Sequence, residues 1–174
     1  MDADKIVCLK IYSIRVQKGK SMDQQKALRE HVLELLEGKS AHIDLETAIR
    51  KFPVDKINTR VENSPHTAWQ LLEHIRIAQW DILEFSRSAE HVSPDFPEGY
   101  WPKNEGTEAG WQKTLEQVLD DLQAMRDLVS DEANDLYMIF PWGDGQTLLR
   151  EASLVADHNA YHLGQIVLLN KMLR

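Results

Sequence analysis

Long stretches of apolar residues spaced three and four apart constrain the fold of this chain most. In the clearest stretch, residues 107–129, the apolar residues are Trp111, Leu115, Val118, Leu122, Met125 and Val129. Steps of four and three place side chains on one face of an α-helix, and they are typical of helices that pack in bundles. This stretch is therefore predicted to be an amphipathic helix with one buried face.

Comparable spacing occurs in three further stretches, residues 23–37, 64–88 and 146–173. In the first of these, the predicted apolar stripe consists of Leu28, Val32, Leu35 and Leu36, and Gly38 is predicted to end the helix. Ser64 and Pro65 are predicted to begin the second of these helices, because Ser favours the N-cap and Pro the first helical position. A short helix is also predicted over residues 44–51, with Asp44 as its N-cap. No alternating strand pattern follows residue 21, so the predicted fold is all-α, a four-helix bundle.

The beginning of the chain differs from the rest. Residues 6–16 are rich in apolar and β-branched side chains, which favour an extended, strand-like conformation. The run is too short to span a membrane, which takes about 20 residues, and it lacks the features of a secretory signal. We expect residues 1–21 to be an N-terminal extension, either an accessory strand or an ordered arm, and residues 22–174 to form the bundle. Alternatively, the natural start is Met22.

Charge and cysteine content exclude several classes of protein. The formal net charge is −8 and no cluster of Lys and Arg is present, which argues against a nucleic-acid partner. Cys8 is the single cysteine, so an intramolecular disulfide is impossible. Together with the lack of a long apolar run, this favours a cytoplasmic protein without a membrane partner.

Three histidines are predicted to face a common interior. His158 and His162 are four residues apart, so on a helix they lie on one face and can share a divalent cation. His74 lies within the apolar stripe of the helix over residues 64–88. Three neutral imidazoles leave coordination positions open, as catalytic metal sites do. The other histidines are not expected to be ligands: His31, His42, His66 and His91.

Several residues near these histidines have two interpretations. Tyr100 and Trp101, in the Pro- and Gly-rich loop over residues 91–106, cover one end of the bundle or simply pack against the core. Gln165, one turn beyond His162, orients a metal-bound group or fills a polar gap. Tyr161 is a proton donor or a packing residue. No residue is assigned as catalytic.

Four segments together resemble the DinB-like (YfiT-like) metal-binding four-helix bundles. They are residues 71–75 (LLEHI), 100–102 (YWP), 145–149 (GQTLL) and 158–166 (HNAYHLGQI), of which the last is the most specific. The resemblance extends over residues 22–174. It implies a bundle with a long crossover connection, often a homodimer, and one divalent metal ion, nickel or zinc, bound by His74, His158 and His162.

The resemblance also implies candidate activities. Characterised members of the family include thiol S-transferases that use bacillithiol or mycothiol, and a thiol-dependent isomerase. We therefore expect a metal-dependent transferase that joins a small-molecule thiol to an electrophile, because a divalent ion lowers the pKa of a bound thiol or water. A thiol pocket is expected beside Tyr100, Trp101 and Trp142. The alternatives are a metal-dependent hydrolase and a non-catalytic, metal-stabilised protein that binds a small ligand or a partner chain.

Overall fold

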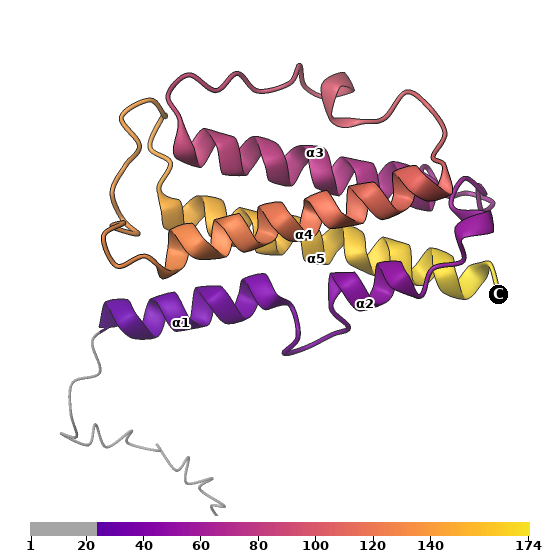
Figure 1. Cartoon of the computed structure of the whole chain (residues 1–174), viewed down its shortest axis with the longest axis horizontal. Helices are drawn as coiled ribbons and strands as arrows, with labels where there is room; N and C mark the ends of the chain where they lie inside the picture. The colour runs from indigo at the N-terminus through magenta and orange to yellow at the C-terminus, as the bar shows by residue number, and fades with distance from the viewer. Residues whose placement is uncertain (1–23) are drawn as a thin grey trace, which may run out of the picture.

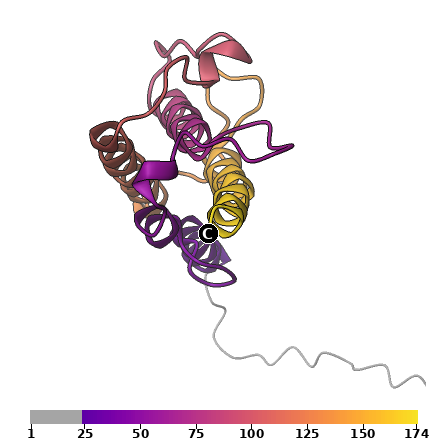
Figure 2. The same ribbon diagram turned by 90° about the vertical axis from the view of Figure 1, so that its right-hand side faces the viewer.

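Three long helices and one interrupted helix build the bundle in the computed structural model, which describes residues 24–174. The long helices are α3 (Ala68–Arg87), α4 (Glu108–Ser130) and α5 (Leu148–Met172). The interrupted helix consists of α1 (Gln24–Glu37) and α2 (Leu45–Arg50), which follow one another along the same edge of the bundle (Figures 1 and 2). The predicted all-α bundle is confirmed for the described residues, whereas the N-terminal extension lies outside them.

A long crossover connects α3 to α4. Both helices run in the same direction, so residues 88–107 return along the whole length of the bundle (Figure 1). This connection includes the short 3-10 helix η2 (Glu98–Tyr100) and passes over α3. The long crossover implied by the family resemblance is therefore present, and it places Tyr100 and Trp101 against the side of α3 rather than at the end of the bundle.

Helix α3 begins three residues later than the sequence suggested. Thr67, not Ser64, is its N-cap: the Thr67 hydroxyl accepts a hydrogen bond from the Gln70 backbone (3.2 Å), and the Gln70 side chain accepts one from the Thr67 backbone (3.0 Å). This reciprocal capping box satisfies two backbone donors at once, which Ser64 and Pro65 cannot do. The Ser64 hydroxyl instead donates to the His66 carbonyl (2.7 Å). Residues 61–66 consequently stay outside the helix, as a loop beside α5.

The interior separates into two apolar clusters along the bundle axis. Leu71 and Ile75 of α3 belong to one cluster, and Leu83 belongs to the other. A polar link lies between them: the Asn159 amide donates to Gln79 (2.6 Å), and the Gln79 amide donates to the carbonyl of Val118 (2.7 Å). This chain joins α5, α3 and α4 across the centre of the bundle, close to the positions of the three histidines.

Helix α1 corrects one prediction about the core. Leu35, expected in the buried stripe, is 61% exposed, whereas Arg29 is buried. The Arg29 guanidinium donates to the carbonyls of Val129 and Asn134, which satisfies the charged group inside the fold. Across residues 24–174, none of the helices combines the length and the apolar character that a membrane span requires.

Candidate metal centre

His74 is held in one orientation and one tautomer by the crossover loop. Its Nδ1 lies 2.9 Å from the carbonyl oxygen of Tyr100. A carbonyl oxygen only accepts, so the imidazole must donate through Nδ1–H, and the lone pair of the neutral ring is then on Nε2. Trp101 stacks on the same ring, with centroids 4.0 Å apart and planes 3° apart. The loop thereby presents Nε2 of His74 to the bundle interior.

His162 is oriented in the same way, but from its own helix. This side chain is 7% exposed, and its Nδ1 lies 2.9 Å from Oε1 of Gln165, one turn further along α5. An amide oxygen accepts, so the imidazole donates through Nδ1–H and keeps its lone pair on Nε2. Gln165 therefore acts as the polar partner that fixes this ring, as the outer hydrogen bonds of metal-ligating histidines do.

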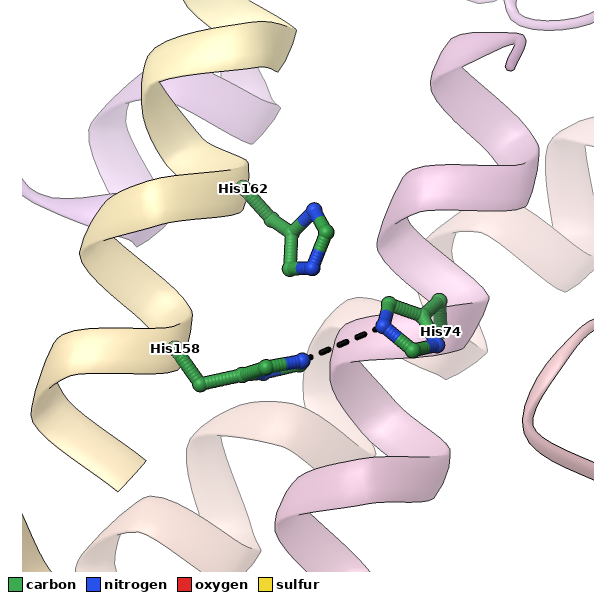
Figure 3. A group of neighbouring side chains, drawn as sticks. All are labelled: His74, His158 and His162. Carbon is green, nitrogen blue, oxygen red and sulfur yellow. Dashed lines mark hydrogen bonds between the residues drawn. The ribbon is translucent and has the colours of Figure 1, made fainter. Parts of the chain in front are cut away.

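His158 completes a triangle of imidazole nitrogens. Its Nε2 lies 3.1 Å from Nε2 of His74, and one ring nitrogen from each of the three histidines lies within 4.8 Å of the others. Figure 3 shows the two rings of α5 converging on the ring of His74. Two nitrogens bound tetrahedrally to one ion at about 2.05 Å are separated by about 3.3 Å. The observed spacing therefore fits a shared divalent cation.

The environment keeps these imidazoles uncharged. Burial, reinforced by the neighbouring His162 and His74, lowers the pKa of His158 from 6.5 to about 4. Burial is also the main cause of the lowered pKa of His74 and of His162. Neutral imidazole is the form that ligates metals, so no proton has to be displaced from the three rings at neutral pH.

The positions of the protons and lone pairs on the three imidazoles provide one further test of a shared cation. With Nδ1–H committed on His74 and His162, the lone pair of each ring is on Nε2, and Nε2 of His74 lies 3.1 Å from Nε2 of His158. Converging lone pairs repel unless a proton or a cation lies between them. Nδ1 of His158 is buried and has no hydrogen-bond partner among the described residues, so nothing ties its proton to that nitrogen. Three imidazole nitrogens suit a borderline ion such as nickel or zinc.

Tyr100 links this group to a second polar cluster on α3. Its hydroxyl donates to Oδ2 of Asp81 (2.6 Å), and Oδ1 of Asp81 lies 2.7 Å from Nε2 of His91. Burial, together with the Asp81 carboxylate, raises the pKa of Tyr100 to about 12, so the hydroxyl remains protonated. Because the carbonyl of Tyr100 contacts His74, the two clusters share one loop residue.

The remaining residues singled out in the sequence lie in different places. The ring of Tyr161 meets His162 edge-on at 4.8 Å, but its side chain is 65% exposed. The Trp142 indole donates to the carbonyl of Phe85 (2.8 Å) and stacks on Phe140. Phe85 follows His74 by eleven residues, which is about 16 Å along a helix. Trp142 thus packs near the C-terminal end of α3 and not beside the three histidines.

Sequence reasoning missed two neighbours of the group. His66, to which no role was assigned, stacks on Trp101 with centroids 3.9 Å apart. The Asp81–His91 pair joins α3 to the crossover loop. Both contacts are made by loop residues whose positions no helical period determines. The capping box at Thr67 was the one local signal that could have placed His66 in a loop rather than in α3.

A comparison with known protein families gives a match over most of the chain. The family model of the DinB superfamily matches residues 37–166, more than half of the chain, and the match includes all three histidines. The chain belongs to the DinB superfamily. No curated protein and no solved structure gives a significant match. In this member of the DinB superfamily, three neighbouring histidines could hold a metal ion.

Proposed function

We propose that His74, His158 and His162 bind one divalent cation, nickel or zinc, through their Nε2 atoms. The observation that carries this proposal is the pair of outward hydrogen bonds, from Nδ1 of His74 to Tyr100 and from Nδ1 of His162 to Gln165. Each bond leaves the lone pair of its ring on Nε2, and Nε2 of His74 lies 3.1 Å from Nε2 of His158. One shared cation would satisfy the inward nitrogens of all three rings at once.

On this site we propose a metal-dependent enzyme that transfers a thiol to a small electrophile. A bound divalent ion supplies Lewis acidity, which lowers the pKa of a coordinated thiol. In the overall reaction, the thiol sulfur bonds to a carbon of the electrophile, the leaving group departs with its electron pair, and the thiol proton passes to solvent. The bacillithiol type of thiol is taken from the family resemblance.

The surroundings favour a thiol over water as the nucleophile. Among the described residues, the groups in hydrogen-bond or ring contact with the three imidazoles include no carboxylate that would act as a general base. Glu73, adjacent in sequence to His74, is instead paired with Arg76 (2.6 Å) and Thr114 (2.8 Å). A free thiol has a pKa near 8.5 and water one near 15.7, so a thiol needs less help to ionise.

Elemental analysis and a turnover assay test the two parts of the proposal. The purified protein should contain close to one nickel or zinc ion per chain. The metal-loaded protein, mixed with bacillithiol and monochlorobimane, should form the conjugate faster than the metal-free protein does. Metal without turnover would favour the non-catalytic, ligand-binding alternative, whereas a protein that takes up no metal would contradict the site itself.

The homodimer implied by the family is a separate proposal. Sedimentation velocity of the metal-loaded protein should give the mass of two chains. A single-chain mass would contradict the dimer, but it would leave the metal site unaffected, because all three ligands come from one chain.

A further inference from the structure

A pocket of about 320 Å³ begins one helical turn away from the three histidines. It lies between the loop formed by residues 61–66 and the C-terminal half of α5. On α5 its lining begins at Gln165, the residue that fixes His162. On α3 it reaches Leu71, three residues before His74. The pocket therefore adjoins the candidate metal centre on both helices.

The walls of this pocket suit an uncharged ligand. They are largely apolar, with Leu71, Leu168, Leu169 and Met172 among the lining residues. Glu62 is the one charged side chain of the lining, and it is exposed. Leu168 is 57% and Met172 56% exposed, so the described part of the chain leaves these apolar surfaces uncovered. The volume is at the lower end of the range for small-molecule sites.

Two polar groups lie at the end of the pocket nearest the histidines. The ring nitrogens of His66 make no hydrogen bond to another described residue, and neither does Nε2 of Gln165. Burial, with the nearby Arg60, lowers the pKa of His66, so its ring is neutral and offers one donor and one acceptor. His66 and His74 both stack on Trp101, so this indole lies between the pocket and the metal ligand.

We propose that this pocket binds the uncharged, apolar part of the small-molecule substrate, whose polar reactive end lies between His66 and Gln165. The inference rests on the proposed function, because the substrate must reach the metal centre. Its physical basis is the combination of apolar walls, unused hydrogen-bonding groups at one end, and the shared residue Gln165. A charged or strongly polar substrate would lose its hydration against these walls without compensation.

A neutral fluorescent probe, N-phenyl-1-naphthylamine, tests the pocket without any need for turnover. The metal-loaded protein should bind the probe with saturation at one per chain. Leu168→Glu should weaken binding at least tenfold, since it places a charge at the apolar rim, and Met172→Glu should act in the same direction. Both side chains are exposed, so neither change threatens folding.

Leu35→Glu is the matched control. Leu35 is also an exposed leucine, but it lines a different cavity of about 440 Å³ between α1, α4 and α5. Its replacement should leave probe binding within twofold. The proposal is overturned if Leu168→Glu binds the probe normally, if Leu35→Glu abolishes binding, or if Leu168→Glu converts a dimer to single chains. The last result would make this face a subunit interface.

Metal content, measured on the same samples, separates this inference from the proposed function. Probe binding that depends on Leu168 in a protein that takes up no metal would support the pocket and contradict the metal centre. One metal per chain without probe binding would contradict the pocket alone. With bacillithiol and monochlorobimane, Leu168→Glu should raise KM for the electrophile at least fivefold and change kcat less than twofold. A fall in kcat with unchanged KM would contradict the substrate role.

Discussion

His74 and Asp81 lie two turns apart on the same face of α3, and both form a hydrogen bond with Tyr100 of the crossover loop. Around Asp81, each carboxylate oxygen has a partner: Oδ1 pairs with His91 and Oδ2 accepts from Tyr100. Around His74, the outer nitrogen is satisfied, but the inner nitrogen faces two other imidazoles. The first cluster is complete within the protein, whereas the second has acceptors that need a cation or a proton.

The difference separates a structural polar cluster from a candidate site. A buried polar group costs about 1–3 kcal/mol when it has no partner, so a fold normally satisfies each such group internally. Asp81 does so by joining α3 to His91 and Tyr100, which anchors the loop. Hydrogen bonds to the protein instead orient the rings of His74 and His162, while Nδ1 of His158 has no hydrogen-bond partner among the described residues. We call Asp81, His91 and Tyr100 the closed cluster, and His74, His158 and His162 the open cluster. The closed cluster should therefore govern stability, and the open cluster should govern metal binding.

The largest expected effect is the loss of metal from the open cluster. Replacing His74, His158 or His162 singly by Ala removes one of three ligands, so metal affinity should fall at least 100-fold by calorimetric titration. His91→Ala is the matched control, because it removes a buried histidine from the closed cluster, and it should change affinity less than threefold. Equal losses in all four variants would mean that the histidines act through folding alone.

The second effect concerns stability. Asp81→Ala leaves the Tyr100 hydroxyl and Nε2 of His91 without their partner, so the free energy of unfolding should fall by about 3 kcal/mol in urea melts. Glu84→Ala, which removes an exposed ion pair with Arg87 on the same helix, should cost less than about 0.5 kcal/mol. Metal stoichiometry of Asp81→Ala should stay near one per chain at temperatures where the variant is folded. A stability equal to that of Glu84→Ala would contradict the role of the closed cluster.

Much of the open cluster could be predicted because it is built from helical periodicity. His158 and His162 are four residues apart, and His74 falls within a stripe of apolar residues, so the two faces were predicted from spacing alone. The position of Trp142 could not be predicted, because its hydrogen bond to Phe85 spans 57 residues. Residues 64–66 were misassigned to the beginning of a helix for a local reason. Ser64-Pro65 fits the preferences for the N-cap and the first helical position, but Thr67 and Gln70 form a reciprocal capping box.

The contacts of the closed cluster show the same limit. Asp81 lies on α3, but its partners His91 and Tyr100 come from an irregular loop that has no period. Nothing in the spacing of residues 88–107 indicates which side chains turn toward α3. The break between α1 and α2 was predicted from Gly38 and Asp44, whereas the exposure of Leu35 beside that break depends on how the two pieces pack.

The third effect is a dependence on pH that belongs to the open cluster. Folding lowers the pKa of His158 to about 4, and also lowers those of His74 and His162. The folded state thus binds fewer protons than the unfolded chain between about pH 6.5 and 4, so the stability of the metal-free protein should fall as the pH is lowered through that window. Glu151 and Asp121, whose pKa values are raised by burial, act in the opposite direction.

Urea melts of the metal-free protein at pH 7, 6, 5 and 4.5 measure this dependence. The His158→Ala variant is the comparison, and its stability should decline less steeply over the same range. Metal occupancy should also decrease as the pH is lowered. The loss should begin at a lower pH than at an ordinary histidine site, because these rings resist protonation. Identical slopes in the wild type and in His158→Ala would contradict the assignment of the effect to this ring.

The smallest effect is optical, and it distinguishes two tryptophans that sequence reasoning placed together. Trp101 stacks on His74 at 4.0 Å, whereas Trp142 packs on Phe140. Metal binding at Nε2 changes the charge distribution of the His74 ring, so tryptophan fluorescence should change by roughly a tenth or more when nickel is titrated. Trp101→Phe should remove most of the change, and Trp142→Phe should retain it. The opposite pattern would place the metal near Trp142, and equal changes in both variants would mean that neither indole reports on His74.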